Sequence, residues 1–175
     1  MKRFEEGRSS SQSVANAIIA YSKTANGSYI FFRILEGIVI NKADQFTPQE
    51  LSNIVYSYHK SENASPDPLL LDLRQAVMDR LHTFKPVELC MVLVAYTEEG
   101  LLDEEMLEAF DLQYRVKFED MKPRDSATFY YCFTKAGFKG SGNFYKYLQK
   151  AVSKTIRAFE GPELRQMFYK FHDSE

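Results

Sequence analysis

The chain is 175 residues long, 45% hydrophobic and 26% charged, with a formal net charge of −2 at pH 7. These are ordinary values for a soluble globular protein with a core of its own, and so small a charge does not direct the chain as a whole toward nucleic acid or an anionic membrane. The most apolar stretch, residues 29–40, contains Arg33 and Glu36, which excludes a membrane-spanning helix.

One sequence pattern recurs along the chain and predicts a helix, here called the A helix, at each copy. After MKRFEEGRSS, which lacks the apolar core of a secretory signal, the pattern is first recognisable in SQSVANAIIAYSK. It is clearest in FTPQELSNIVYSYHK and again in FKPVELCMVLVAYTEEG. The copies start at Phe46, Phe84, Met121 and Phe159, which are 38, 37 and 38 residues apart. A near-constant period of this size indicates an array of structural repeats.

The clearest copy has its own signals for the start of a helix. Thr47 is a candidate N-cap, Pro48 fits the first helical position, and Glu50 completes a capping box. We therefore expect the recurring acids Glu50, Glu88 and Glu163 to cap helices rather than to catalyse a reaction. The apolar residues that follow share one face of the helix: Leu51, Ile54, Val55 and Tyr58.

A second amphipathic helix, here called the B helix, is predicted before each start. Its apolar positions lie 14, 11, 7 and 3 residues upstream: Phe32, Leu35, Val39 and Ala43; Leu70, Leu73, Val77 and Leu81; Leu107, Phe110, Tyr114 and Phe118; Tyr145, Leu148, Val152 and Ile156. Breaker segments such as SENASPDP separate each A helix from the next B helix. In GFKGSGN, residues 137–143, a helix C-cap and a turn are expected, because the GK[ST] ending of a phosphate-binding loop is missing.

These patterns predict an all-α protein of nine helices, with four A–B hairpins and a final A helix near residues 161–172. One hairpin cannot bury both apolar faces, so neighbouring hairpins must stack. The prediction is an α-solenoid of about four and a half helix-turn-helix repeats of 37–38 residues, forming a single domain over residues 1–175. The repeats cover approximately residues 9–45, 46–83, 84–120 and 121–158, with a half repeat at 159–175.

The period, together with the patterns FxPxELxxxxxAY and LLxxLxxxVxxxLxxF, resembles the octotricopeptide and heptatricopeptide repeats of organellar RNA-binding proteins. That group includes the arrays that precede RAP domains and the FAST-kinase-like proteins; the resemblance is to the repeats alone, without a RAP domain. The likeness covers nearly the whole chain and is clearest over residues 46–100. It implies a non-enzymatic subunit of an organellar ribonucleoprotein, foremost a mitochondrial ribosome component that contacts rRNA and neighbouring proteins. The implied location is the mitochondrion, ahead of a plastid or the cytosol.

The side of each A helix opposite its apolar face has polar residues that recur in register. Amide and hydroxyl groups suited to base edges are found at Asn16, Asn53, Thr128 and Gln166. Lysines suited to phosphates are found at Lys23, Lys60 and Lys135. On the last predicted B helix a basic face is formed by Lys146, Lys150, Lys154 and Arg157. These are candidate RNA contacts, although ordinary solvated helix faces would have the same polarity.

Other residues favour a protein partner. In the third repeat the same positions are occupied by Val87, Met91, Val94 and Glu98, and the nearby EEGLLDEEMLEAFD has seven acids that would repel phosphate. The final helix would leave four apolar residues uncovered: Leu164, Met167, Phe168 and Phe171. The alternative is therefore a scaffold or assembly subunit of a mitochondrial complex, such as a respiratory complex or ATP synthase, without RNA contact.

The residue types that commonly carry chemistry form no recognisable site. Cys90 and Cys132 are far apart and favour a reducing compartment over a disulfide scaffold. His59, His82 and His172 lack metal-ligand spacing. We therefore expect no catalytic residue, metal, cofactor, small-molecule substrate or membrane insertion.

Overall fold

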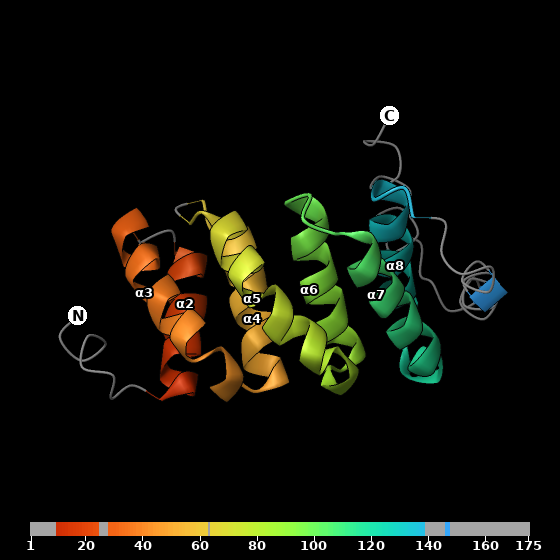
Figure 1. Cartoon of the computed structure of the whole chain (residues 1–175), viewed down its shortest axis with the longest axis horizontal. Helices are drawn as coiled ribbons and strands as arrows, with labels where there is room; N and C mark the ends of the chain where they lie inside the picture. The colour runs from red at the N-terminus through yellow and green to blue at the C-terminus, as the bar shows by residue number, and fades with distance from the viewer. Residues whose placement is uncertain (1–9, 25–27, 63, 139–145, 148–175) are drawn as a thin grey trace. The chain divides into compact units, whose positions relative to one another are not determined.

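The structure is a computed structural model that describes residues 10–24, 28–62, 64–138 and 146–147. The protein is all-α, as predicted: seven α-helices and three short 3-10 helices, with no strand, make up the secondary structure of these residues (Figure 1). The chain divides into two compact units, unit 1 (Met1–Leu101) and unit 2 (Leu102–Glu175).

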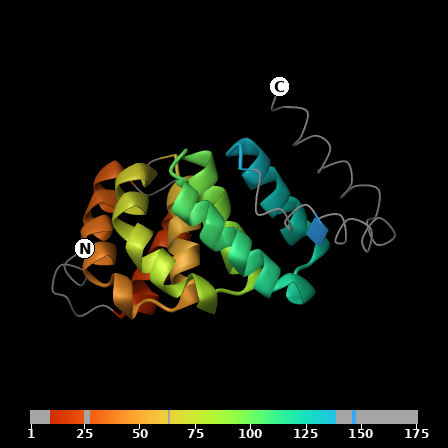
Figure 2. The ribbon, with the colours of Figure 1, turned by 45° about the vertical axis from the view of Figure 1, so that its right-hand side comes forward.

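The described residues of unit 1 form three A helices and two B helices. The A helices are α2 (Ser11–Thr24), α4 (Pro48–Lys60) and α6 (Pro86–Glu98), and the B helices are α3 (Tyr29–Asn41) and α5 (Pro66–Arg80). Helix α4 packs between α2 and α6, and α3 packs against both α2 and α5 (Figures 1 and 2). The A helices of neighbouring repeats therefore lie side by side in this unit.

The core of unit 1 is formed by the apolar faces that the sequence predicts. All four predicted residues of α4, Leu51, Ile54, Val55 and Tyr58, are buried. Burying one such side chain stabilises the fold by about 1.5–3 kcal/mol, so this face alone fixes how α4 is oriented.

Unit 2 has an aromatic core between one B helix and one A helix, α7 (Glu104–Val116) and α8 (Pro123–Lys135). The Tyr114 and Phe129 ring centroids lie 4.9 Å apart, and those of Phe129 and Phe133 lie 5.7 Å apart. Such tilted and edge-on ring pairs add to the stabilisation from burial alone. The Tyr114 hydroxyl also lies 3.0 Å from the Ser126 hydroxyl, which satisfies a buried polar group.

The sequence prediction was wrong about where the B helices end. Ala43, Leu81 and Phe118, predicted as the last apolar positions of three B helices, lie in 3-10 helices: η1 (Ala43–Gln45), η2 (Leu81–Thr83) and η3 (Phe118–Asp120). An apolar spacing of three or four residues suits both helix types, so the pattern could not distinguish them. Leu81 and Phe118 stay buried in the tighter turn, which leads the chain into the next A helix.

The predicted capping box is confirmed. The Thr47 hydroxyl accepts a hydrogen bond from the Glu50 N–H at 3.2 Å, and the Glu50 carboxylate accepts one from the Thr47 N–H at 2.8 Å. Glu88 and Asp125 repeat the second half of this arrangement, accepting from the N–H groups of the residues that precede α6 and α8, at 2.8 and 2.9 Å. These acids stabilise helix starts.

The predicted C-cap in GFKGSGN is also confirmed as far as residue 138. Gly137 has a positive φ of 68°. The Phe138 N–H donates to the Phe133 carbonyl at 2.9 Å, and the Gly137 N–H donates to the Thr134 carbonyl at 3.0 Å. This pair of bonds ends α8 in a Schellman motif, in which glycine adopts the left-handed conformation without steric cost.

Candidate functional site

The best-defined candidate surface is the solvent-facing side of the A helices in unit 1, here called the outer strips. Each helix contributes four residues: Gln12, Asn16, Ile19 and Lys23 on α2; Gln49, Asn53, Tyr56 and Lys60 on α4; Val87, Met91, Val94 and Glu98 on α6. Because α4 packs between α2 and α6, the three strips are neighbours. They form a surface that is polar over α2 and α4 and becomes apolar over α6.

Exposure varies along the outer strips. Asn16, Lys23 and Lys60 are exposed, whereas Asn53 and Tyr56 are half-buried. The lysines therefore reach solvent fully, while the tyrosine presents only part of its ring.

Tyr56 and Lys60 form a pair one helical turn apart. The Lys60 ammonium lies 5.6 Å from the centre of the Tyr56 ring, within the range of a cation–π contact. Unit 2 has the same pair at the same repeat positions, with the Lys135 ammonium 5.9 Å from the Tyr131 ring. Each of these two helices thus presents an aromatic ring next to a cation.

The remaining candidate residues on the A helices differ in what they offer a ligand. Thr128, in unit 2, donates its hydroxyl proton to the Arg124 carbonyl at 2.9 Å, so its oxygen is left to accept bonds only. On α6 Val87 is 44% exposed, and Met91 and Val94 are half-buried. Helix α6 therefore presents apolar side chains where α4 presents Gln49, Asn53 and Tyr56, and an acid where α4 presents Lys60.

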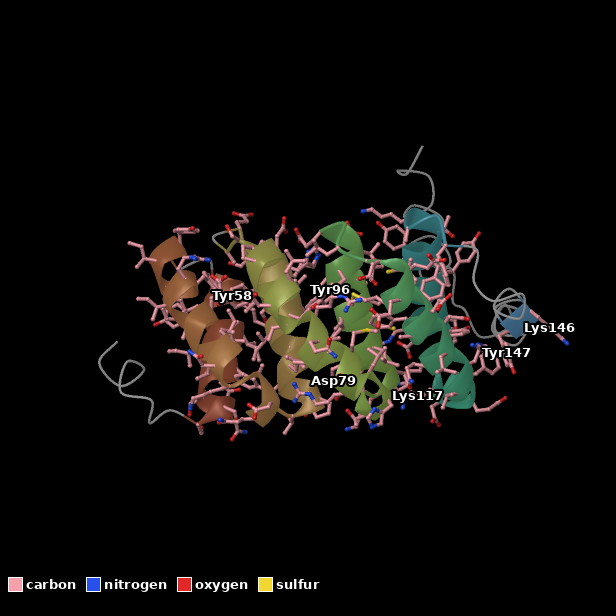
Figure 3. All side chains as sticks on the ribbon, viewed as in Figure 1. Tyr58, Asp79, Tyr96, Lys117, Lys146 and Tyr147 are labelled. Carbon is pink, nitrogen blue, oxygen red and sulfur yellow. The ribbon has the colours of Figure 1, made fainter. Side chains whose placement is uncertain are left out.

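Of the predicted basic face only Lys146 belongs to the described residues, and the predicted final helix lies outside them. Lys146 is exposed, and the adjacent Tyr147 ring lies 5.2 Å from the Phe118 ring (Figure 3). The other candidate residues there lie outside the described part of the chain: Lys150, Lys154, Arg157, Glu163, Leu164, Gln166, Met167, Phe168 and Phe171.

Two buried tyrosine hydroxyls make a contact that the sequence does not reveal. The Tyr58 hydroxyl donates to the Phe32 carbonyl at 2.9 Å, and the Tyr96 hydroxyl donates to the Leu70 carbonyl at 2.6 Å. Both tyrosines point into the interior of unit 1 (Figure 3). Burial raises the pKa of both phenols above the ordinary value, more than any neighbouring charge does. These side chains hold a B helix to the following A helix and are not available to a ligand.

Two further polar contacts also join the hairpins of unit 1. His59 Nδ1 lies 2.6 Å from a carboxylate oxygen of Glu99, the residue that follows α6. The Arg80 guanidinium donates to the Phe46 carbonyl at 2.7 Å and to the Ala43 carbonyl at 2.5 Å. Both contacts stabilise the fold. Residue spacing alone could not have identified Glu99 as the partner of His59, or these two carbonyls as the partners of Arg80.

Neither a metal centre nor a membrane span is found in the part of the chain that can be described. None of its His, Cys, Asp and Glu residues come together in a group of three that could hold a metal ion. None of its helices is both long and apolar enough to cross a bilayer. Comparison of the sequence with models of protein families and with curated proteins finds no match.

Proposed function

We propose that this chain is a non-enzymatic helical-repeat subunit of a ribonucleoprotein and that it binds single-stranded RNA on the outer strips of its A helices. The observation that carries the proposal is the tyrosine–lysine pair found at the same positions of α4 and α8. An aromatic ring can stack on any base, which contributes about 1–3 kcal/mol per base, while a neighbouring ammonium neutralises a phosphate.

The surroundings of Tyr56 and Lys60 suit the same ligand. Helix α2 lies beside α4, and its outer strip adds the exposed Lys23 and Asn16. One strand of RNA crossing both helices would meet a lysine on each, and an amide able to donate to and accept from a base edge.

The proposal takes the chain to be an α-solenoid of about four and a half repeats in one domain, which the side-by-side packing of α2, α4 and α6 supports. The basic face that includes Lys146 would add further phosphate contacts. The resemblance to organellar repeat proteins supports a mitochondrial location, with a mitochondrial ribosome as host and rRNA as ligand.

The test is the binding of a fluorescent single-stranded RNA to the full chain at several salt concentrations. We expect Lys60→Glu to weaken binding roughly tenfold and to lower the salt slope by about one ion, because one phosphate contact is lost. Tyr56→Leu should weaken binding with no change in salt slope. Lys85→Glu, an equal charge change at an exposed residue beyond the outer strips, is the matched control and should have a smaller effect. Equal losses for Lys60→Glu and Lys85→Glu would contradict this site.

A second candidate function is a protein scaffold within a mitochondrial complex, without RNA contact. It is favoured by the apolar outer strip of α6, where Val87 is 44% exposed and Glu98 occupies the lysine position. An exposed apolar strip bordered by polar residues commonly meets another protein. Absence of RNA binding by the wild-type chain at low salt would make this the better assignment.

A further inference from the structure

His59, in the last turn of α4, reaches across to the neighbouring A helix. Its Nδ1 donates to a carboxylate oxygen of Glu99 at 2.6 Å, because a carboxylate can only accept. The equivalent positions of α2, α6 and α8 are occupied by hydroxyl residues: Ser22, Thr97 and Thr134. The hydroxyls of Ser22 and Thr97 donate to carbonyls of their own helices, at 3.1 and 2.6 Å. His59 thus links α4 to the end of α6, whereas Ser22 and Thr97 bond within one helix.

A histidine is not the most stabilising ring for this position. The His59 side chain is only 10% exposed, and its Nε2 is buried with no hydrogen-bond partner among the described residues. A buried nitrogen without a partner costs free energy, and an apolar ring of similar size would avoid that cost. The bond from Nδ1 to Glu99 is therefore what a histidine offers here over such a ring.

The His59 ring also lies beside Tyr56, the residue proposed to stack on a base. The centroids of the two rings are 6.1 Å apart, with an angle of 55° between the ring planes. The Lys60 ammonium lies 5.6 Å from the centre of the same tyrosine ring. Tyr56 is half-buried, so part of its ring is packed and part faces solvent. A ring that is already held by a neighbour loses less conformational freedom when a ligand stacks on it.

We propose that His59 and Glu99 are positioning residues for Tyr56, and that they hold its ring in one orientation for stacking on a base. The carboxylate fixes the imidazole, and the imidazole in turn packs beside the tyrosine ring. This inference rests on the proposed RNA binding by the outer strips. The Glu99 carboxylate also repels phosphate, so loss of its charge alone should strengthen RNA binding, whereas loss of a positioning role should weaken it.

The first experiment measures RNA binding by two variants of the full chain that lose the same charge. Glu99→Gln keeps a side-chain oxygen that accepts from His59 Nδ1, whereas Glu99→Ala has none. We expect Glu99→Ala to bind a fluorescent single-stranded RNA roughly threefold to tenfold more weakly than Glu99→Gln, because part of a stacking contact is lost. Glu98→Ala, the same change at the exposed neighbouring residue, should not weaken binding. Equal affinities of the two Glu99 variants would overturn the proposal.

A double-mutant cycle separates positioning from a general effect on the fold. If Glu99 acts through the Tyr56 ring, its removal should have no weakening effect once that ring is absent. The double variant Tyr56→Leu/Glu99→Ala should therefore bind RNA no more weakly than Tyr56→Leu. If Glu99→Ala weakens binding equally in both backgrounds, the contact only stabilises the fold and the proposal is wrong.

A third measurement needs no RNA. NMR spectra of the full chain with isotope-labelled tyrosine rings report on the surroundings of each ring, and Tyr56→Phe and Tyr131→Phe identify the two signals of interest. Glu99→Ala should move the Tyr56 signals and leave those of Tyr131, whose helix has Thr134 in place of the histidine. Unmoved Tyr56 signals would overturn the proposal. If these signals move but the wild type binds no RNA at low salt, the positioning of the ring stands and the proposed RNA function fails.

Discussion

Tyr58 and Tyr96 occupy equivalent positions of α4 and α6, and the hydroxyl of each donates to a backbone carbonyl of the preceding B helix. The sequence has an aromatic residue at this position of each described A helix, and the rings of Tyr58 and Tyr96 are buried, whereas Tyr21 of α2 is 41% exposed. What the sequence does not reveal is the partner of each hydroxyl, because a backbone carbonyl has no residue type to recognise. The equivalent residue of α8 is Phe133, so burial of the ring is common to all three and the hydroxyl contact is an addition in two of them.

The variant Tyr58→Phe/Tyr96→Phe tests the contribution of the hydroxyls. Loss of two buried hydrogen bonds should cost about 1 kcal/mol each at pH 7. Because burial raises the pKa of both phenols, the folded chain retains protons that the unfolded chain releases. Their contribution is therefore fully present below the unfolded pKa of about 10 and declines above it, by up to about 1.4 kcal/mol per pH unit for each tyrosine.

Urea unfolding at pH 7 and pH 11 checks this expectation. The variant should lose less stability than the wild type between the two pH values. Tyr21→Phe, at an exposed tyrosine, should behave as the wild type does. An equal alkaline loss in all three proteins would show that the phenol protons are not what links stability to pH.

The helices were largely predictable from the sequence, and their joints were not. Thr47, Pro48 and Glu50 give a local signal that needs no tertiary information, so the start of α4 was predicted correctly. The end of each B helix depends on how the chain turns into the next A helix, and this is decided by long-range contacts. Arg80 is the clearest case, since it binds carbonyls 34 and 37 residues earlier in the chain.

Removal of the Arg80 guanidinium should loosen the junction between α5 and the loop before α4. We expect Arg80→Met, which keeps most of the apolar stem, to lower the free energy of unfolding by about 2 kcal/mol, because hydrogen bonds from a charged donor are lost. Thermal denaturation measures the change, and Lys85→Met is a control at an exposed cation. A loss below about 0.5 kcal/mol would be that of an ordinary surface substitution and would count against this role.

The candidate RNA surface could be predicted from the sequence only as a set of positions. Spacing correctly indicated which residues of α2 and α4 share a face, and Asn16, Lys23 and Lys60 are exposed there. Spacing could not show that the Lys60 ammonium lies over the Tyr56 ring, since that depends on side-chain conformation. Nor could it show that Ile30 and Ile40 of α3 are exposed, because the buried residues Phe32, Leu35 and Val39 already satisfied the predicted apolar pattern.

Unit 1 has its own core, and this predicts that it folds without the rest of the chain. A fragment of residues 10–101 should be helical and should unfold in one cooperative transition, since α4 has a neighbour on each side. Circular dichroism with urea titration would measure both properties. A fragment without a cooperative transition would show that unit 1 depends on residues beyond 101, as a single continuous domain would require.

The tyrosine hydroxyl contacts also determine where the polypeptide can change in length. Donor and acceptor are 26 residues apart in both contacts, so an inserted residue between Phe32 and Tyr58, or between Leu70 and Tyr96, would break the match. The link from α4 to α5, around the exposed Glu62, falls outside both intervals. An epitope tag or fluorescent reporter placed in that link would leave both tyrosine contacts untouched, although it would lie between the partners of the Arg80 and His59 contacts, so their loss on insertion would separate the two kinds of contact.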